Sequence, residues 1–400
     1  MCIIIFRKVK NLSLKKTIIY VGAVILDFFL NVYRKFKPIP PRIYFCYNQS
    51  IHHIYHSIFI AIELSNIQKE YEVVIFSTSK EASDIIKEEL SSIPNNIKFV
   101  SLRHFGYNKI NFNINLFVLL CRLHMHKPKA VIVTDYFDNV FRQLRLKTFW
   151  VFVGHGPENR GYYSSNLHIK DYDLVIFPGR RDVEELEKKI GVLNNYVIIG
   201  YSKLDYFIYH KTKPLNLFKD SKPIIMYNPH FEKSSSSFFD KGMELLQSLS
   251  NTGKYNIILM PHPDLSRKYP ELINLAKEIP NVAVINRPKI NLDYMAIADI
   301  YITDVSSAVF EWLYFDKPVL FFNTKSEKNI YSAWKCGRIV RDTPSMLESI
   351  EYSLEHPEEF HNQRKEMFDK VFFNPPLLKR GVRGVSKMIA QFVYDRLKNI

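Results

Sequence analysis

Metal-binding cysteine patterns are absent from this sequence. The four cysteines among its 400 residues lie far apart and form no CxxC pair: Cys2, Cys46, Cys121 and Cys336. This spacing argues against a structural zinc site and is typical of reduced, buried or incidental thiols in a cytosolic protein. His52 and His56 would share one face of a helix, but no acid beside them completes an HExxH motif. We therefore expect no metal, and the pair either packs inside the fold or lines a cleft.

Tandem repeats and low-complexity tracts are also missing. The hydrophobic fraction of 47% and the aromatic fraction of 14% are ample for packed cores, so global disorder is excluded. A chain of 400 residues is too long for one ordinary core. We expect two domains of common size.

No apolar run reaches the roughly 20 residues that a spanning helix needs. The longest candidate, TIIYVGAVILDFFLNVY, contains Asp27 and Asn31 and is flanked by basic residues: Arg7, Lys8, Lys10, Lys15, Lys16, Arg34, Lys35 and Lys37. A signal peptide is disfavoured because KPIPPR follows instead of a small-residue cleavage site. The segment is a surface anchor, a true span or an ordinary amphipathic helix. We predict the first, on the cytoplasmic face of the cell membrane, because basic flanks favour an anionic leaflet.

Acidic residues are outnumbered by basic ones, which gives a formal net charge of +15 and a pI near 9.4. Such a charge indicates an anionic partner, which can be nucleic acid, a membrane surface or a phosphate-rich substrate. A basic α/β module that binds nucleic acid is one hypothesis. The chain shows neither an aromatic-interleaved basic patch nor a nucleic-acid motif, so we expect no nucleic-acid partner.

Short apolar runs alternate with amphipathic helical patterns along the chain, which predicts parallel sheets covered by helices. The first half runs from RIYFCYN, through a helix over 49–65, to YVIIG near residue 200. A looser stretch at 209–223 reads as a linker, after which the pattern restarts with PIIMYNPHF. The sequence therefore predicts two α/β halves of similar length.

Polar residues gather where the predicted strands end. His155 follows FWVFV between two glycines, His230 follows IIMY, and His262 follows IILM between two prolines. Ligands of open α/β sheets bind at the carboxyl ends of the strands, so these turns are candidate sites. Ser306 and Ser307 follow the strand IYIT and Asp304. They either cap the next helix or bind a phosphate at its start.

Five ordered motifs, VGHG, YNPHF, LMPHPD, IIGYSKLDYF and ADIYITDVSSAVFEWLYFDKPVLFF, resemble those of the CDP-glycerol glycerophosphotransferase family. The resemblance covers about residues 150–325 and continues toward residue 400. It implies a GT-B fold, in which two Rossmann-like domains face a cleft and the C-terminal one holds the nucleotide. Val305 stands where the family commonly has tyrosine, and His230 where it tends to have threonine.

The resemblance also implies roles for individual residues. His155 is the expected base that takes the proton of the acceptor hydroxyl, and His262 is expected to stabilise the leaving phosphate. Asp304 is expected to orient its turn. The expected substrate-binding residues are Gly154, Gly156, His230, Pro261, Arg287, Asp304, Ser306, Ser307, Lys379, Arg380 and Arg383. Neither a metal nor another cofactor is expected.

The sequence therefore predicts an α/β, GT-B transferase with four parts. These are a membrane-associating segment (1–36), an acceptor domain (37–212), a nucleotide-binding domain (213–378) and a C-terminal helix (379–400). Its expected donor is CDP-glycerol or a similar activated alditol phosphate, and its acceptor is lipid-linked or polymeric, as in teichoic acid or capsule synthesis. The alternative is a GT-B glycosyltransferase that uses a nucleotide sugar for capsule or lipopolysaccharide.

Overall fold

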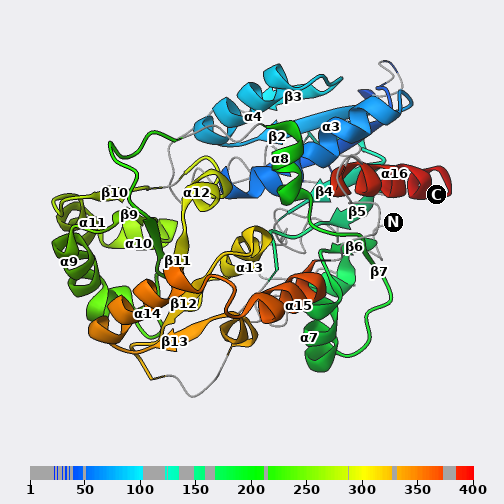
Figure 1. The fold of residues 1–400 in the computed structure, drawn as a ribbon. Helices are drawn as coiled ribbons and strands as arrows, with labels where there is room; N and C mark the ends of the chain where they lie inside the picture. Colours follow the sequence, from blue (N-terminus) through cyan, green and yellow to red (C-terminus); the bar gives the residue numbers. More distant parts are fainter. Residues whose placement is uncertain are drawn as a thin grey trace.

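A computed structural model describes most of the chain. The described residues are 39–47, 51–101, 122–123, 125–134, 148–157, 167–210, 215–286, 288–326, 331–372 and 384–400, with the single positions 22, 25, 29, 32, 33 and 36. Figure 1 shows two lobes, each built around one sheet. The predicted N-terminal segment lies almost entirely outside the described residues.

The N-terminal lobe carries a parallel sheet with the strand order β3-β2-β1-β4-β5-β6-β7. Its elements are β1 (Arg42–Tyr47), η1 (Ile51–His56), α3 (Ile58–Ile67), β2 (Glu72–Ser77), α4 (Lys80–Ser92), β3 (Lys98–Ser101), β4 (Ala130–Val133), β5 (Phe149–Phe152), η3 (Leu167–Asp171), β6 (Leu174–Phe177), α7 (Arg180–Ile190), β7 (Tyr196–Ile198), η4 (Ser202–Asp205) and α8 (Tyr206–Tyr209). The order reverses between β1 and β4, where doubly wound sheets bind ligands.

The C-terminal lobe carries a second parallel sheet with the order β10-β9-β8-β11-β12-β13. Its elements are β8 (Ile224–Asn228), η5 (Phe238–Gly242), α9 (Met243–Thr252), β9 (Asn256–Leu259), α10 (Pro263–Lys268), α11 (Pro270–Lys277), β10 (Val282–Val284), α12 (Leu292–Ile297), β11 (Ile300–Thr303), α13 (Val309–Trp312), η6 (Leu313–Phe315), β12 (Val319–Phe322), η7 (Ser332–Cys336), β13 (Arg338–Val340), α14 (Thr343–Glu355) and α15 (His361–Val371). A last helix, α16 (Val385–Lys398), follows.

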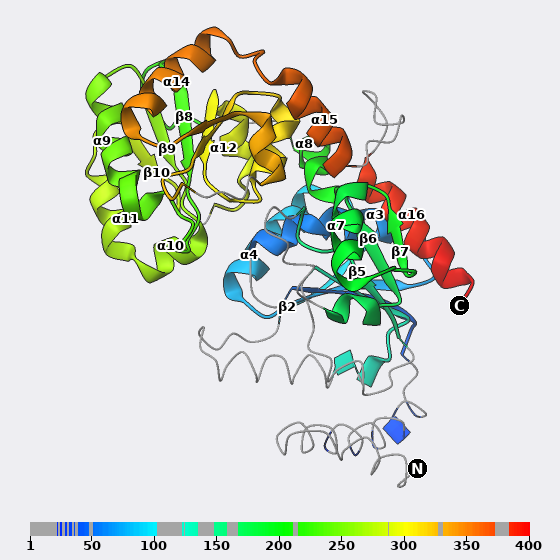
Figure 2. The ribbon, with the colours of Figure 1, turned by 90° about the horizontal axis from the view of Figure 1, so that it is seen from below.

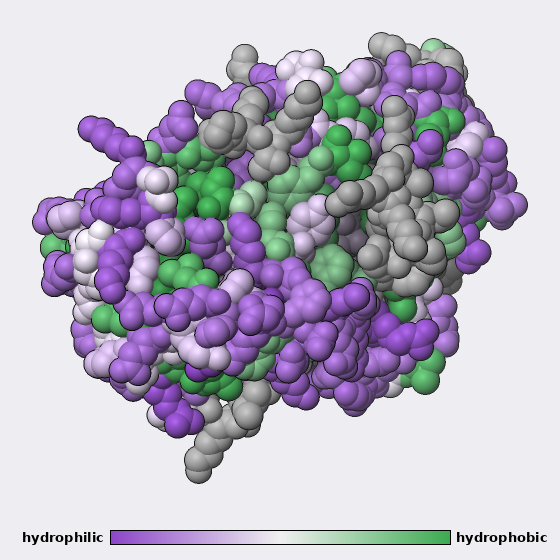
Figure 3. Space-filling model, viewed as in Figure 1, coloured by the Kyte–Doolittle hydropathy of each residue, from purple (hydrophilic) through white to green (hydrophobic). Residues whose placement is uncertain are grey.

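Continuous apolar runs form the central strands because both faces of each sheet are covered. In β1, Ile43 and Phe45 enter one core while Tyr44 and Cys46 enter the core on the opposite face. The first of these cores continues into the C-terminal lobe, where it includes Trp312. Figure 3 shows that hydrophilic side chains cover most of the surface on one side of the molecule.

The last helix returns to the N-terminal lobe, where α16 packs against α3 (Figures 1 and 2). The Asp205 carboxylate accepts hydrogen bonds from the backbone N–H groups of Val385, at 3.2 Å, and Ser386, at 2.6 Å. These groups open α16 and have no partner within the helix. A Cβ on Gly384 would lie 1.9 Å from Asp205 Oδ1, so only glycine fits there. Burial raises the pKa of Asp205 to about 6 despite these hydrogen bonds.

The prediction of one continuous helix over 49–65 is wrong for the first part of that range. Residues 51–56 form the 3-10 helix η1, and α3 begins only at Ile58. The break falls at Ser57, whose N–H donates to Ile54 O at 3.1 Å and whose hydroxyl lies 2.8 Å from Tyr47 Oη. A 3-10 turn places every third residue on one face. His53 and His56 therefore share the buried face, and His52 is exposed.

Candidate active site

His155 lies in a loop at the carboxyl end of β5. Gly154 and Gly156 on either side of it have φ angles of 74° and 117°, a region that L side chains rarely adopt. The His155 Nδ1 lies 3.2 Å from the carbonyl oxygen of Thr134 at the end of β4. A carbonyl only accepts, so Nδ1 carries the proton and the lone pair of the neutral ring is on Nε2.

Two further histidines lie against this loop. The His53 ring stacks on His155 with ring centroids 5.0 Å apart and planes at 20°. His56 is 3% exposed, and its ring centroid is 5.5 Å from that of Tyr201. A Cβ on Gly156 would lie 3.0 Å from Tyr201 Oη and 3.4 Å from His56 Cε1. The sequence left open whether His52 and His56 line a cleft or pack inside the fold. In the structure, His53 and His56 lie against the His155 loop, whereas His52 is exposed.

His230 and His262 end the neighbouring strands β8 and β9, with ring centroids 5.4 Å apart. His262 Nδ1 accepts from the N–H of Asp264 at 3.1 Å and so caps α10. His230 Nδ1 accepts from the N–H of Glu232 at 3.3 Å. The proton of each neutral ring is therefore on Nε2, which makes both side chains hydrogen-bond donors. This is the opposite tautomer to that of His155.

Asp304 begins the turn between β11 and α13 and fixes it by hydrogen bonds to backbone N–H groups. Its side chain is 1% exposed and accepts from the N–H groups of His230 at 3.0 Å, Ser237 at 3.0 Å and Val305 at 2.7 Å. Burial raises its pKa to about 6, although these hydrogen bonds favour the ionised form. Asp304 thus joins the His230 loop to the serine turn, as a residue that orients the turn would.

Ser306 and Ser307 lie in that turn, and both are partly exposed. The helix α13 begins at Val309, with Ala308 as its N-cap, so neither serine is the cap residue. Ser306 Oγ instead accepts from the N–H of Ala308 at 3.3 Å, a local bond that orders the turn.

Two of the quoted sequence motifs meet at Glu311 in α13. Its carboxylate accepts from Lys203 Nζ at 2.8 and 2.9 Å, from Tyr201 Oη at 2.5 Å and from Asn291 Nδ2 at 2.6 Å. Lys203 and Glu311 are both buried. GYSKLD of the N-terminal lobe and SSAVFEW of the C-terminal lobe are therefore joined by one buried ion pair. The sequence gives no local signal for this pairing, because Lys203 and Glu311 lie 108 residues apart along the chain.

The remaining predicted residues fall into two groups. Pro261 directly precedes His262 and follows β9, at the edge where the C-terminal site residues gather. Four expected substrate contacts lie outside the described residues: Arg287, Lys379, Arg380 and Arg383. Among the residues that the structure describes, no group of three or more histidine, cysteine or acidic side chains is placed to hold a metal ion.

Two Rossmann-like lobes with polar turns at the carboxyl ends of their strands define the GT-B architecture. A sequence model of one family, "CDP-Glycerol:Poly(glycerophosphate) glycerophosphotransferase", matches residues 125–374. The chain belongs to this family. The family and fold predictions are thereby confirmed, apart from the N-terminal membrane segment.

Individual relatives agree with this assignment. The Minor teichoic acid biosynthesis protein GgaB of Bacillus subtilis (strain 168) is 22% identical over 235 residues, which is 54% of this chain and 23% of GgaB. The chain thus spans about a quarter of this curated relative's length.

Solved structures show the fold. A variant of the wall teichoic acid polymerase TagF matches with a TM-score of 0.65 at 14% identity, covering 96% of this chain and 97% of that one. UDP-GlcNAc 2-epimerase from Neisseria meningitidis bound to UDP-GlcNAc matches with a TM-score of 0.59 at 15% identity, covering 88% and 99%.

Proposed function

We propose that this protein transfers glycerol phosphate, or a related alditol phosphate, from a CDP-activated donor to a lipid-linked or polymeric acceptor. Membership of the glycerophosphotransferase family supports the reaction class. A TagF variant soaked with CDPG has the same fold, with a TM-score of 0.64. The names of GgaB and TagF support a place in teichoic acid synthesis.

The observation that carries the mechanism is that Nδ1 of His155 and Nδ1 of His262 face backbone groups of opposite kind, a carbonyl oxygen and an N–H. The proposed base needs a ring nitrogen with a lone pair, and the bond from Nδ1 to Thr134 O puts that lone pair on Nε2 of His155. The proposed phosphate ligand needs an N–H donor, and the cap formed by Nδ1 of His262 puts the proton on its Nε2. Backbone contacts at Nδ1 thus leave His155 able to accept a proton and His262 able to donate a hydrogen bond, each through its Nε2.

In the proposed reaction, the acceptor hydroxyl oxygen attacks the β-phosphorus of the donor. The bond from that phosphorus to the bridging oxygen breaks, CMP leaves, and the hydroxyl proton moves to His155 Nε2. His262, His230 and the hydroxyl groups of Ser306 and Ser307 donate to the diphosphate oxygens. Phosphoryl transfer depends mainly on such positioning and charge stabilisation.

We assign the acceptor to the domain of residues 37–212 and the nucleotide to that of residues 213–378. His155 comes from the first and His262 from the second, and Tyr201 and Glu311 join the two near these loops. The helix within 379–400 packs back on the first domain.

We also propose that residues 1–36 bind an anionic membrane surface. The described apolar positions there have helical spacing and are exposed: Ile25 by 54%, Phe29 by 64%, Val32 by 45%, Tyr33 by 44% and Phe36 by 83%. Basic residues flank this stripe on both sides. In the described part of the chain, no helix is both long and apolar enough to cross a bilayer. An interfacial helix needs only one apolar face.

A donor screen tests the reaction. The purified protein is given CDP-glycerol, CDP-ribitol and a panel of nucleotide sugars with a soluble lipid-linked acceptor analogue, and nucleotide release is measured. We expect release of CMP from a CDP-alditol only when the acceptor is present. Release from a nucleotide sugar alone would favour the glycosyltransferase alternative.

A further inference from the structure

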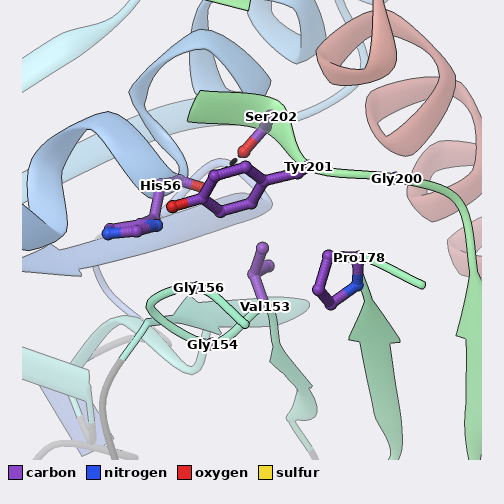
Figure 4. Close-up of a pocket in the computed structure, with 8 residues that line it drawn as sticks. All are labelled: His56, Val153, Gly154, Gly156, Pro178, Gly200, Tyr201 and Ser202. Carbon is purple, nitrogen blue, oxygen red and sulfur yellow. Dashed lines mark hydrogen bonds between the residues drawn. The ribbon is translucent and has the colours of Figure 1, made fainter. Parts of the chain in front are cut away.

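A small pocket in the N-terminal lobe lies beside the His155 loop, and the proposed mechanism does not use it. Gly154, Gly156 and Gly200 form much of its wall, and His56 and Tyr201 reach into it (Figure 4). Figure 4 shows the Tyr201 ring lying over the glycine loop, with its hydroxyl directed toward His56. The pocket therefore shares a wall with the loop that carries the proposed base.

One of the lining residues, His56, has a buried ring nitrogen without a hydrogen-bond partner in the described part of the chain. Among the described residues, no group hydrogen-bonds its Nδ1, although the side chain is only 3% exposed. The Ser202 hydroxyl donates to the His56 carbonyl at 2.5 Å and fixes the backbone at this position. Leaving a buried polar atom unpaired is costly, so such an atom in a native fold requires an explanation. A ligand that completes the hydrogen bond provides one.

We propose that His56 Nδ1 binds a second hydroxyl group of the acceptor, next to the hydroxyl that attacks the donor. The acceptor would then end in a polyol unit, with one hydroxyl at His155 and another in this pocket. This inference rests on the proposed function, and it assigns a binding role to His56, which lies outside the matched family region of 125–374.

The chemistry of the pocket selects a hydroxyl over a charged group. Burial lowers the pKa of His56 well below its usual value, and the nearby Lys203 charge lowers it further, so the ring is neutral at pH 7. None of the eight lining residues then carries a formal charge. A neutral ring nitrogen offers either a lone pair or a proton. A hydroxyl complements both states, whereas an anion needs a donor and an ammonium group needs an acceptor.

The pocket also restricts the size of its occupant. The Gly156 backbone, with φ of 117°, passes so close to Tyr201 and His56 that no side chain fits between them. Tyr201 is held by its bond to Glu311 and by stacking on Phe372, with ring centroids 5.2 Å apart. A single hydroxyl on a narrow carbon chain suits this space better than a sugar ring does.

The test compares two soluble acceptor analogues, one ending in a glycerol unit and one lacking only the secondary hydroxyl. With the wild-type protein and CDP-glycerol, we expect the acceptor KM to rise roughly 2- to 12-fold when that hydroxyl is missing. The H56F variant keeps the ring shape but has no nitrogen, and it should not discriminate between the analogues. The H56N variant, whose side-chain amide lies near the position of Nδ1, should recover part of the discrimination. Donor KM and melting temperature serve as controls.

A second measurement does not depend on turnover. Protein labelled with ¹⁵N-histidine is titrated with each analogue, and the His56 nitrogen signals are assigned by their loss in H56F. A shift with the full analogue, and none with the shortened one, supports the hydroxyl site even if no donor is cleaved. Equal discrimination by wild type and H56F, or an unchanged His56 signal, overturns the inference. Absent CMP release with a shifted His56 signal would instead count against the proposed function alone.

Discussion

At the scale of single residues, the two proposed catalytic histidines differ in which ring nitrogen the fold occupies. In both, a backbone group engages Nδ1, and asparagine can reproduce that contact because its amide group lies near Nδ1. Replacing each histidine by asparagine therefore removes Nε2 while keeping the loop contact. This separates a role in chemistry from a role in loop structure.

We expect H155N to keep the bond to Thr134 O and to lose turnover by about 10²–10⁴-fold, because no group remains to take the acceptor proton. Its affinity for the CDP-activated donor should stay near that of the wild type. H262N should keep the cap on α10, since asparagine is a favourable N-cap, but should weaken donor and CMP binding as well as turnover. Calorimetry with the donor, beside turnover and melting temperature, distinguishes the two. Loss of donor binding in H155N would contradict its assignment as the base.

Asp205 gives a pH prediction whose sign follows from its pKa. Its folded-state pKa of about 6 lies above the ordinary value of 3.8, so the folded protein binds this proton more tightly than the unfolded chain does. The stability that Asp205 contributes is therefore fully present below pH 3.8 and is lost as the pH rises through about 6. The difference in pKa corresponds to about 3 kcal/mol.

The variant D205N cannot ionise, so it lacks this pH dependence. We expect the free energy of unfolding of the wild type, minus that of D205N, to fall by about 2 kcal/mol between pH 4 and pH 6.5. Urea denaturation at several pH values measures this difference. A difference that stays constant or rises with pH would show that folding does not raise the pKa of Asp205.

At the scale of elements, ion pairs with buried carboxylates join the lobes. One is Lys203 with Glu311, and a second network places Lys289 Nζ at 2.9 Å from Glu89, which also accepts from Tyr55 at 2.6 Å and His210 at 2.7 Å. Burial raises the pKa of Glu89, but its hydrogen bonds outweigh this and hold the pKa at about 2. Glu89 therefore stays ionised at neutral pH.

Removing one partner of a buried pair leaves the other charge unpaired, so E311A should destabilise the protein by about 3–5 kcal/mol. E311Q keeps the shape and an acceptor for Tyr201 and should cost less. The matched control is E185A, because Glu185 and Lys188 form a surface pair, with side chains 52% and 67% exposed. Its effect should be within about 1 kcal/mol. Melting curves rank the stability of the three variants. Equal losses of stability in E311A and E185A would refute a linking role for the buried pair.

The sequence predicted the strands better than it predicted the helix boundaries and the contacts between distant segments. The apolar runs of β1, β4 and β11 are readable because a strand covered on both faces leaves a local signal. The division of residues 49–65 into η1 and α3 has no such signal, since it depends on Tyr47 and on the His155 loop. In the sequence, Glu311 has the pattern of an ordinary helix residue; only the fold shows that Lys203 lies beside it. Local patterns predict elements, whereas contacts between distant segments determine which polar side chains meet.

At the scale of the whole molecule, the N-terminal segment is separate in sequence from the residues of the proposed active site. The exposed apolar stripe ends at Phe36, and the first strand begins at Arg42, the last residue of the proline-rich KPIPPR. An enzyme with the proposed lipid-linked acceptor would gain from such an anchor, because the anchor would raise the local concentration of the acceptor. Anchoring and chemistry should therefore be separable by truncation.

We expect deletion of residues 1–36 to release the protein from vesicles that contain anionic lipid, while CMP release with a soluble acceptor analogue persists. The physical reason is that binding needs both the apolar stripe and its basic flanks. A full-length variant with Phe29 and Phe36 changed to serine keeps every charge and should bind more weakly, which isolates the apolar contribution. Co-sedimentation at physiological salt, with neutral vesicles as the control, measures both effects. Undiminished sedimentation of the truncated protein would place the membrane contact on the basic surface of the two lobes instead.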